Sequence, residues 1–204
     1  MLPNGPSCKE LIISHQARKK AFQLTEEIEQ PLDLTNHLPF RIAIVSNLLA
    51  LNRDWRIRDL CDLEPREMRV LINIGSYQPI KSADIAYQSR LDSYTVSRAV
   101  KKLQEKDLVT IKPDQISRNI KNLSLNEKGK VLYEQVTQAI DERSKELESV
   151  LDEHECQQLY VMLEKIEDKA EQLLAQQALK RINQGDNAPA DQKELIRWYK
   201  KGLL

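Results

Sequence analysis

Residues 93–125 read SYTVSRAVKKLQEKDLVTIKPDQISRNIKNLSL, and their pattern changes from helical to β-type partway along. Its first half places Val96, Val100 and Leu103 at helical spacing, which predicts a helix with one buried face. Its second half holds a β-type run, LVTIK, a polar turn, and a second run, KNLSL, in which Leu123 and Leu125 alternate with polar residues. The stretch therefore predicts a helix followed by a β-hairpin.

The residues before this stretch add two more helices. An acidic, proline-bearing start predicts a helix over 64–77. Ser82 is expected to cap a short helix over 83–89, and a turn at Arg90-Leu91 leads to a second capping signal at Asp92-Ser93. Two helices joined by a short turn and followed by a hairpin form a winged helix-turn-helix, whose second helix enters the major groove of DNA.

The outer face of this second helix is small, hydroxylic and basic, as a helix in the major groove requires. Hydroxyl side chains near its start allow close approach to base edges, while basic side chains suit guanine or phosphate. An arginine at the hairpin tip suits a narrow minor groove. The predicted DNA contacts are Ser82, Ser93, Tyr94, Thr95, Ser97, Arg98, Lys101 and Lys102 in the helices, and Lys112, Arg118 and Asn119 in the hairpin.

The distribution of charge supports this interpretation. The 204 residues carry 31 Lys and Arg and 31 Asp and Glu, and a net charge of zero excludes a uniformly basic protein. Residues 90–130, however, hold ten basic and five acidic residues, a difference of +5, whereas residues 131–180 hold five basic and twelve acidic ones, a difference of −7. A basic DNA-reading segment is thus followed by an acidic helical one.

The whole chain is expected to be mainly α with a small β-hairpin wing, because five glycines are too few for the turns of a sandwich or barrel. Helices are predicted over 9–30, from about 36 to 55, over 127–149 and over 153–182, with one more in the tail. The expected parts are an N-terminal arm or helix able to dimerise (1–35), a long linking helix (36–62), a winged helix-turn-helix domain (63–126), two long dimerisation helices (127–182) and a C-terminal tail able to form one short helix (183–204).

A heptad pattern in the last long helix predicts a second copy as partner. Apolar residues recur there at spacings of four and three, which indicates a dimer seam or an intrachain core. The positions are Leu159, Leu163, Ile166, Ala170 and Leu173. Because a long helix with one apolar stripe needs a partner, a homodimer is the simplest expectation.

Four pieces of sequence stand in the order and spacing of a known family. They are LEPREMRVL at 63–71, SYTVSRAVKKL at 93–103, KDLV at 106–109 and NLSLNEKG at 122–129. Over about residues 35–175 the chain thereby resembles the MarR family of bacterial transcriptional regulators. The resemblance implies a homodimer joined by its terminal helices on a pseudo-palindromic operator, with release of DNA by a small aromatic or phenolic ligand.

The chain departs from the family pattern in the wing. The family often has Asp-Arg-Arg there, whereas this chain has Ser117-Arg118-Asn119 and keeps only the middle arginine. Asp107 stands where glycine is usual before Leu108-Val109, and aspartate tolerates a positive φ better than most residues.

We therefore expect a homodimeric DNA-binding regulator, most simply a repressor. A protein–protein adaptor that uses the winged helix only as a scaffold is the alternative, because fold alone does not decide function. The sequence has no nucleophile–base pair, glycine-rich phosphate loop or metal-ligand spacing, so we predict neither an enzyme nor a cofactor. His37 and Arg41 are candidates for a ligand pocket, and capping or surface roles are equally consistent with their positions.

Two further features have simple structural interpretations. The run Asp152-Glu153-His154-Glu155-Cys156 is favoured as a capped helix start rather than a metal site, because His154 and Cys156 point to different helix faces. Cys61 is favoured as an inert thiol, since only Arg58 offers nearby positive charge.

The cysteines and the apolar runs predict a cytoplasmic protein. Three widely spaced cysteines argue against a disulfide framework and fit a reducing compartment. The first residues carry no apolar leader region, and no apolar run approaches the ~20 residues that a membrane helix needs.

Overall fold

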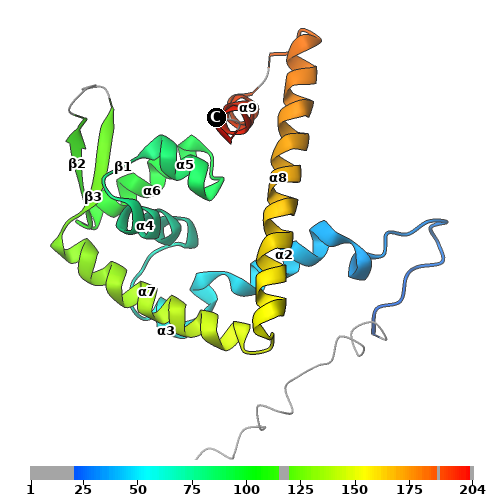
Figure 1. Cartoon of the computed structure of the whole chain (residues 1–204), viewed down its shortest axis with the longest axis horizontal. Helices are drawn as coiled ribbons and strands as arrows, with labels where there is room; N and C mark the ends of the chain where they lie inside the picture. Colours follow the sequence, from blue (N-terminus) through cyan, green and yellow to red (C-terminus); the bar gives the residue numbers. More distant parts are fainter. Residues whose placement is uncertain (1–20, 115–119, 188, 203–204) are drawn as a thin grey trace, which may run out of the picture. The chain divides into compact units, whose positions relative to one another are not determined.

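The computed structural model describes residues 21–114, 120–187 and 189–202, in which helices predominate (Figure 1). These residues fall into two compact units, divided between Arg53 and Asp54. The first unit contains the 3₁₀ helix η2 (Leu34–Asn36), helix α2 (Leu38–Leu49) and the 3₁₀ helix η3 (Leu51–Arg53).

In the N-terminal unit, two of the predicted helices differ from the structure. Residues 22–30 are not helical, because their irregularly spaced apolar side chains give a helix no single face to bury; residues 9–20 lie outside the described part of the chain. Helix α2 has Pro39 in its first turn as expected, but it ends at Leu49 rather than near Trp55. A new helix starts at Trp55 because the Asp54 carboxylate accepts a hydrogen bond from the Arg56 N–H at 2.9 Å.

The second unit holds the predicted winged helix and the long helices that follow it. Its helices are α3 (Trp55–Arg58), α4 (Pro65–Tyr77), α5 (Ser82–Ser89), α6 (Ser93–Glu105), α7 (Glu127–Glu148), α8 (Glu153–Asn183) and α9 (Ala190–Gly202). Its strands are β1 (Ile80–Lys81), β2 (Val109–Pro113) and β3 (Lys121–Leu125). The fold is therefore mainly helical with a small wing sheet, as predicted.

The sheet of the described residues has three antiparallel strands in the order β1-β3-β2, rather than the predicted two. Strands β2 and β3 form the predicted hairpin, with Val109 opposite Leu125. Strand β1 adds a third strand by placing Ile80 opposite Leu123. With only two residues, β1 is too short to show an alternating pattern in the sequence.

The core of this unit lies beneath α6. Met68, Leu71 and Ile74 of α4 are fully buried together with Ile85 of α5, Val96 and Leu103 of α6, and Leu123 of β3. The predicted inner face of α6 is thus confirmed, and its opposite face is left for solvent.

Capping residues set the starts of the helices. Asp92 caps α6, and Asp152 with Glu155 forms the predicted capping box of α8. Ser82 is not a cap: it is the first residue of α5, and the cap position belongs to Lys81, which makes no side-chain capping bond. Lys81 pairs with Asn122 in the sheet and is extended, and the helix starts one residue earlier than predicted.

A close backbone contact joins the wing to α7. Asp107 has a φ of 55°, the conformation that the sequence suggested it would tolerate. The Asn126 side chain accepts a hydrogen bond from the Gly129 N–H at 2.9 Å, and a Cβ on Gly129 would lie 2.0 Å from the carbonyl oxygen of Leu108. Only glycine allows this approach without a shift of the backbone.

Candidate nucleic-acid interface

The start of α6 is fixed by Asp92. Its carboxylate accepts hydrogen bonds from the backbone N–H of Thr95 at 2.8 Å and from the Thr95 hydroxyl at 2.6 Å. Both bonds hold the pKa of Asp92 below its ordinary value, and the bond from the Thr95 hydroxyl has the larger effect. Thr95, a predicted DNA contact, is therefore half-buried and engaged in the cap rather than directed outward.

The remaining predicted residues of α6 share one exposed face. Tyr94 is 71% exposed, and the Arg98 guanidinium lies 5.7 Å from the centre of its ring, so the two side chains form a cation–π pair. The other exposed members of this face are Ser93, Ser97, Lys101 and Lys102. We call these six residues the polar face of α6.

Two of the three basic side chains on this face lie near an acidic one. Lys102 Nζ lies 2.8 Å from Glu105 Oε2, and Lys101 Nζ lies 3.9 Å from Glu105 Oε1. The hydrogen bond from Lys102 lowers the pKa of Glu105. Arg98, in contrast, is exposed, and its guanidinium lies against the Tyr94 ring.

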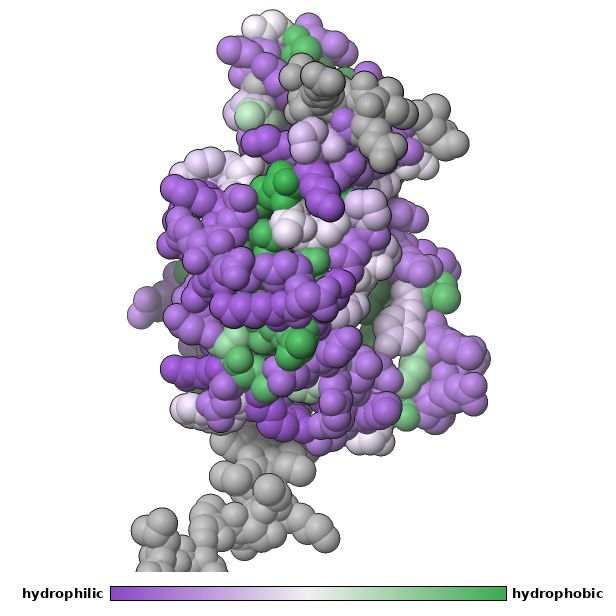
Figure 2. All heavy atoms as spheres, turned by 90° about the vertical axis from the view of Figure 1, so that its left-hand side faces the viewer, coloured by the Kyte–Doolittle hydropathy of each residue, from purple (hydrophilic) through white to green (hydrophobic). Residues whose placement is uncertain are grey.

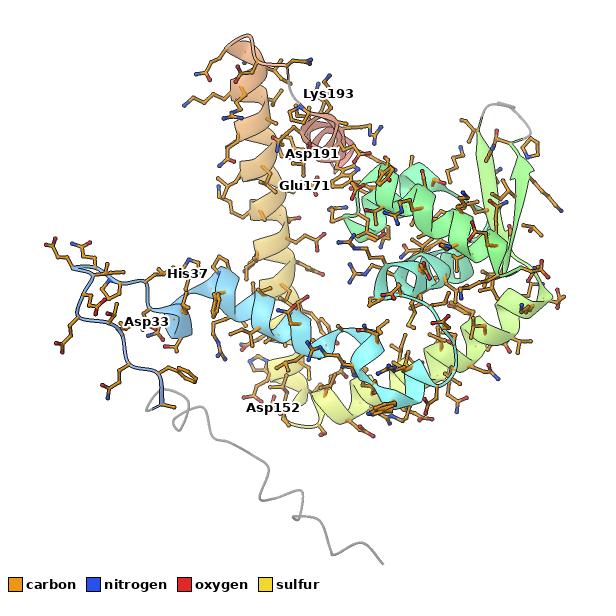
Figure 3. All side chains as sticks on the ribbon, turned by 180° about the vertical axis from the view of Figure 1, so that it is seen from behind. Asp33, His37, Asp152, Glu171, Asp191 and Lys193 are labelled. Carbon is orange, nitrogen blue, oxygen red and sulfur yellow. The ribbon has the colours of Figure 1, made fainter. Side chains whose placement is uncertain are left out.

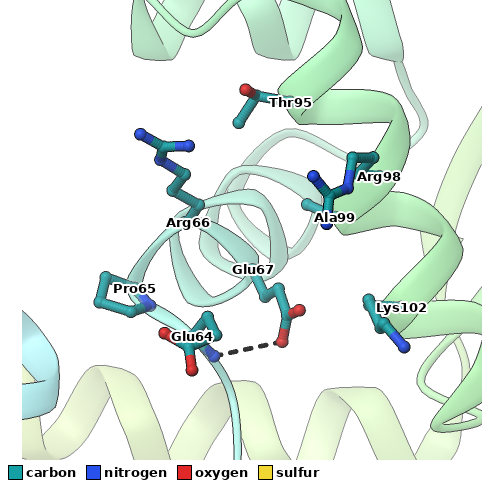
Figure 4. Close-up of a pocket in the computed structure, with 8 residues that line it drawn as sticks. All are labelled: Glu64, Pro65, Arg66, Glu67, Thr95, Arg98, Ala99 and Lys102. Carbon is teal, nitrogen blue, oxygen red and sulfur yellow. Dashed lines mark hydrogen bonds between the residues drawn. The ribbon is translucent and has the colours of Figure 1, made fainter.

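Sequence reasoning missed Arg66 in the first turn of α4. Its exposed side chain lies beside α6 at a surface pocket of about 370 Å³ (Figure 4). The two acidic residues at this pocket, Glu64 and Glu67, form the capping box of α4, in which the Glu64 N–H donates to the Glu67 carboxylate at 3.1 Å. The pocket is lined by Glu64, Pro65, Arg66, Glu67, Thr95, Arg98, Ala99 and Lys102. Only the three-dimensional packing of α4 on α6 brings Arg66 to the basic side chains.

The wing is partly described. Lys112 is exposed on β2. Beyond β2, the Asp114 N–H donates a hydrogen bond to the Ile120 carbonyl at 2.8 Å, which joins the two sides of the hairpin. The predicted contacts Arg118 and Asn119 lie outside the described residues. From the wing side, the surface is mostly hydrophilic with small apolar patches (Figure 2).

The other candidate residues lie apart from the polar face. Ser82 is half-buried at the start of α5. His37 is the N-cap residue of α2, and its carbonyl accepts a hydrogen bond from the Arg41 N–H at 3.0 Å. Their roles in DNA and ligand binding stay predictions.

Neither cysteine in the described parts is activated. Burial raises the pKa of the Cys61 thiol and of the Cys156 thiol, which disfavours the reactive thiolate. Within residues 21–114, 120–187 and 189–202, no cluster of three or more His, Cys, Asp and Glu could hold a metal ion. No helix in these ranges is both long and apolar enough to span a membrane.

Comparison with known proteins gives a consistent answer. Residues 62–115, from just before α4 into the wing, match the model of the MarR family. A MarR/EmrR family transcriptional regulator from Acinetobacter sp. ADP1 has a similar structure, with a TM-score of 0.64 and 27% identity over 69% of this chain and 99% of that one. No curated protein sequence matches the chain.

Two more distant structures share the fold. One is S. aureus MepR in complex with DNA, with a TM-score of 0.60 and 24% identity over 66% of this chain and 98% of that one. The other is CouR from Rhodococcus jostii RHA1 bound to p-coumaroyl-CoA, with a TM-score of 0.58 and 19% identity over 65% and 93%.

The residues that match the family model include α4, α5 and all of α6, with its polar face. Together, the wing sheet, the exposed basic helix and these similarities show a winged helix-turn-helix fold whose residues 62–115 match the MarR family of transcriptional regulators.

Proposed function

We propose that the chain is a homodimeric repressor that reads a pseudo-palindromic operator with the polar face of α6. The observation that carries the proposal is the division of α6 into two sides. Its apolar side is buried against α4, whereas Tyr94, Ser97 and Arg98 are exposed on the other. A helix divided in this way can enter the major groove without losing its packing.

The individual contacts follow from the chemistry of the side chains. Ser97 and Arg98 lie where a recognition helix contacts base edges, and Arg98 can donate two hydrogen bonds to guanine. Lys101, Lys102 and Arg66 suit phosphates because they reach the edges of the same face. We assign Arg118 at the wing tip to the minor groove or its phosphates.

The second copy is proposed from the apolar seam of α8. Leu159, Leu163 and Leu173 are 41%, 43% and 45% exposed, which is unusual for leucines repeated along one helix. A two-fold dimer that covers this seam would place two α6 helices about one DNA turn apart, ~34 Å. Each would then read one half of an inverted repeat.

An aromatic or phenolic effector is proposed to release the DNA. CouR, which shares the fold, is bound to p-coumaroyl-CoA, an aromatic acyl thioester. His37 and Arg41 supply a ring nitrogen and a guanidinium that could bind the polar end of such a ligand. The ligand must bind the DNA-free arrangement more tightly in order to shift the population away from the DNA-bound one.

Selection from a random pool of duplex DNA tests the proposal. A homodimeric reader enriches an inverted repeat whose half-sites are centred about 10 base pairs apart or at a multiple of that spacing. A promoter carrying the enriched site upstream of a reporter should then be silenced by the protein and restored by the effector. Enrichment of no sequence would contradict the proposal and favour the adaptor alternative.

A further inference from the structure

Helix α9 lies beyond the region matched to the MarR family, yet it packs against the DNA-reading helices. It contacts α8 and, seen nearly end-on, lies between α8 and α5 (Figure 1). Its Ile196 and Trp198 are buried, with 9% and 6% of their surface exposed. The helix is thus a packed part of the second unit rather than a free tail.

One contact of α9 lies directly at the polar face of α6. The Ser93 N–H points to both oxygens of the Glu194 carboxylate at 3.3 Å, and the Ser93 hydroxyl donates to the same carboxylate. The Glu194 side chain is only 12% exposed, so its charge is held in place. A carboxylate is stabilised here because the N-terminus of a helix carries partial positive charge.

This is also the end of the helix that a helix-turn-helix protein presents to DNA. The first residues of a recognition helix contact base edges, and helix N-termini bind phosphate oxygens. Glu194 therefore occupies donors that DNA would use, and its negative charge repels the phosphates on either side. DNA and Glu194 cannot both bind Ser93.

Further contacts hold α9 in this position. Lys201 Nζ lies 2.8 Å from Asp84 Oδ1 on α5. Arg90, in the turn between α5 and α6, lies over the rings of Tyr87 and Trp198, at 4.5 and 5.9 Å from their centres.

Helix α8 adds to this attachment. The Arg90 guanidinium forms an ion pair with Glu171 at 2.6 Å, on the side of α8 that faces α9 (Figure 3), and a longer one with Glu167 at 3.4 Å. Only 12% of the Glu171 side chain is exposed. The charge of Arg90, in the turn between α5 and α6, is thereby paired with carboxylates of α8.

From these contacts we infer that α9 is an autoinhibitory helix, which competes with DNA for the N-terminus of α6. The inference rests on the proposed function of α6 and adds a regulatory step to it. The free protein holds Glu194 on Ser93, and DNA binding requires α9 to leave. A ligand or partner that draws α9 away would then increase DNA affinity, in the opposite sense to the effector proposed above.

Replacing Glu194 with glutamine tests the competition. Glu194→Gln keeps the size of the side chain but removes the negative charge, so the full chain should bind a 30-base-pair duplex at least about fivefold more tightly. Glu164→Gln, the same charge change at an exposed position of α8, is the matched control and should leave affinity unchanged. Fluorescence anisotropy of labelled duplex measures both.

The outcomes separate this inference from the proposed function. If the wild-type chain and both variants bind DNA equally, or Glu194→Gln binds more weakly, α9 is not inhibitory and only this inference fails. If no variant binds any duplex, the proposed function fails as well.

A second measurement follows α9 directly. In a chain carrying Trp55→Phe, the fluorescence of Trp198 reports its own burial, since these are the two tryptophans of the sequence. Addition of duplex should increase quenching of Trp198 by acrylamide, because α9 leaves its site. Unchanged quenching at saturating DNA would overturn the inference.

Discussion

Single side chains determine which surface α6 exposes. Asp92 uses its carboxylate to cap the helix, and Thr95 is drawn into that cap. The capping bonds orient the first turn, so that Tyr94 and Ser97 point outward while Val96 points into the core. The cap therefore positions the polar face of α6.

Arg98 is the residue whose loss should affect DNA recognition most. Arg98→Ala removes donors suited to guanine, so we expect a loss of affinity for the selected site of about 1–3 kcal/mol and a relaxed preference at one base position. Arg181→Ala, on α8, should change neither. Anisotropy titrations on the selected duplex and on single-base variants provide the measurement. Equal affinities for all of them would show that Arg98 makes no base contact.

Gly129 should tolerate no side chain. Gly129→Ala would place a Cβ 2.0 Å from the Leu108 carbonyl oxygen, so the wing and α7 must separate, and we expect a loss of about 1–3 kcal/mol in the free energy of unfolding. Gly202→Ala is the control, because its Cβ would meet nothing closer than the Tyr87 hydroxyl at 3.7 Å. Urea unfolding of the two variants compares them. Equal stability of the two variants would show that the backbone at Leu108 and Gly129 can move apart without loss of free energy.

Between elements, an acidic and basic cluster ties α3 to α7. Arg56 Nη2 lies 3.1 Å from Asp54 Oδ2 and Arg56 Nη1 lies 3.1 Å from Glu146 Oε1, while Arg143 approaches Asp54 at 3.6 Å. The hydrogen bond from Arg56 lowers the pKa of Asp54 below its ordinary value of 3.8. Ionised Asp54 therefore stabilises the folded state above about pH 4.

This cluster predicts a particular response to acid. As pH falls below about 4 and through the lowered pKa of Asp54, its stabilisation is lost, so unfolding free energy should fall more steeply in the wild-type chain than in Asp54→Asn. Asp168→Asn, exposed on α8, should keep the wild-type slope. Denaturant unfolding between pH 2 and pH 7 measures the slopes. Parallel curves for all three proteins would contradict a role for Asp54.

The elements also show which parts of the fold the sequence could predict. Helices α4 and α6 were predictable because their apolar side chains repeat at helical spacing, and α6 and α8 also carry local capping residues. Strand β1 was not, because two residues show no period and its partner Leu123 lies far along the chain. The same reason applies to the site: the polar face of α6 follows from local spacing, whereas the bond between Ser93 and Glu194 joins residues 101 positions apart.

For the whole molecule, the exposed seam of α8 predicts the oligomeric state. The wild-type chain should have twice the 23.6 kDa chain mass in light scattering, because burial of the seam leucines favours a dimer. Leu163→Lys places a charge in that seam, so its mass should shift toward one chain and its affinity for a two-half-site duplex should fall. Lys165→Ala is a control on the same helix. A wild-type mass of one chain would contradict the dimer.

In the proposed complex, the polar face of α6 enters the major groove. Dimethyl sulfate tests it directly, because it methylates guanine N7 in the major groove and adenine N3 in the minor groove. On the selected duplex, we expect the wild-type chain to protect guanine N7 in both half-sites, and Arg98→Ala to lose protection at one guanine of each half-site. Full occupancy of the duplex with every guanine N7 still reactive would contradict it.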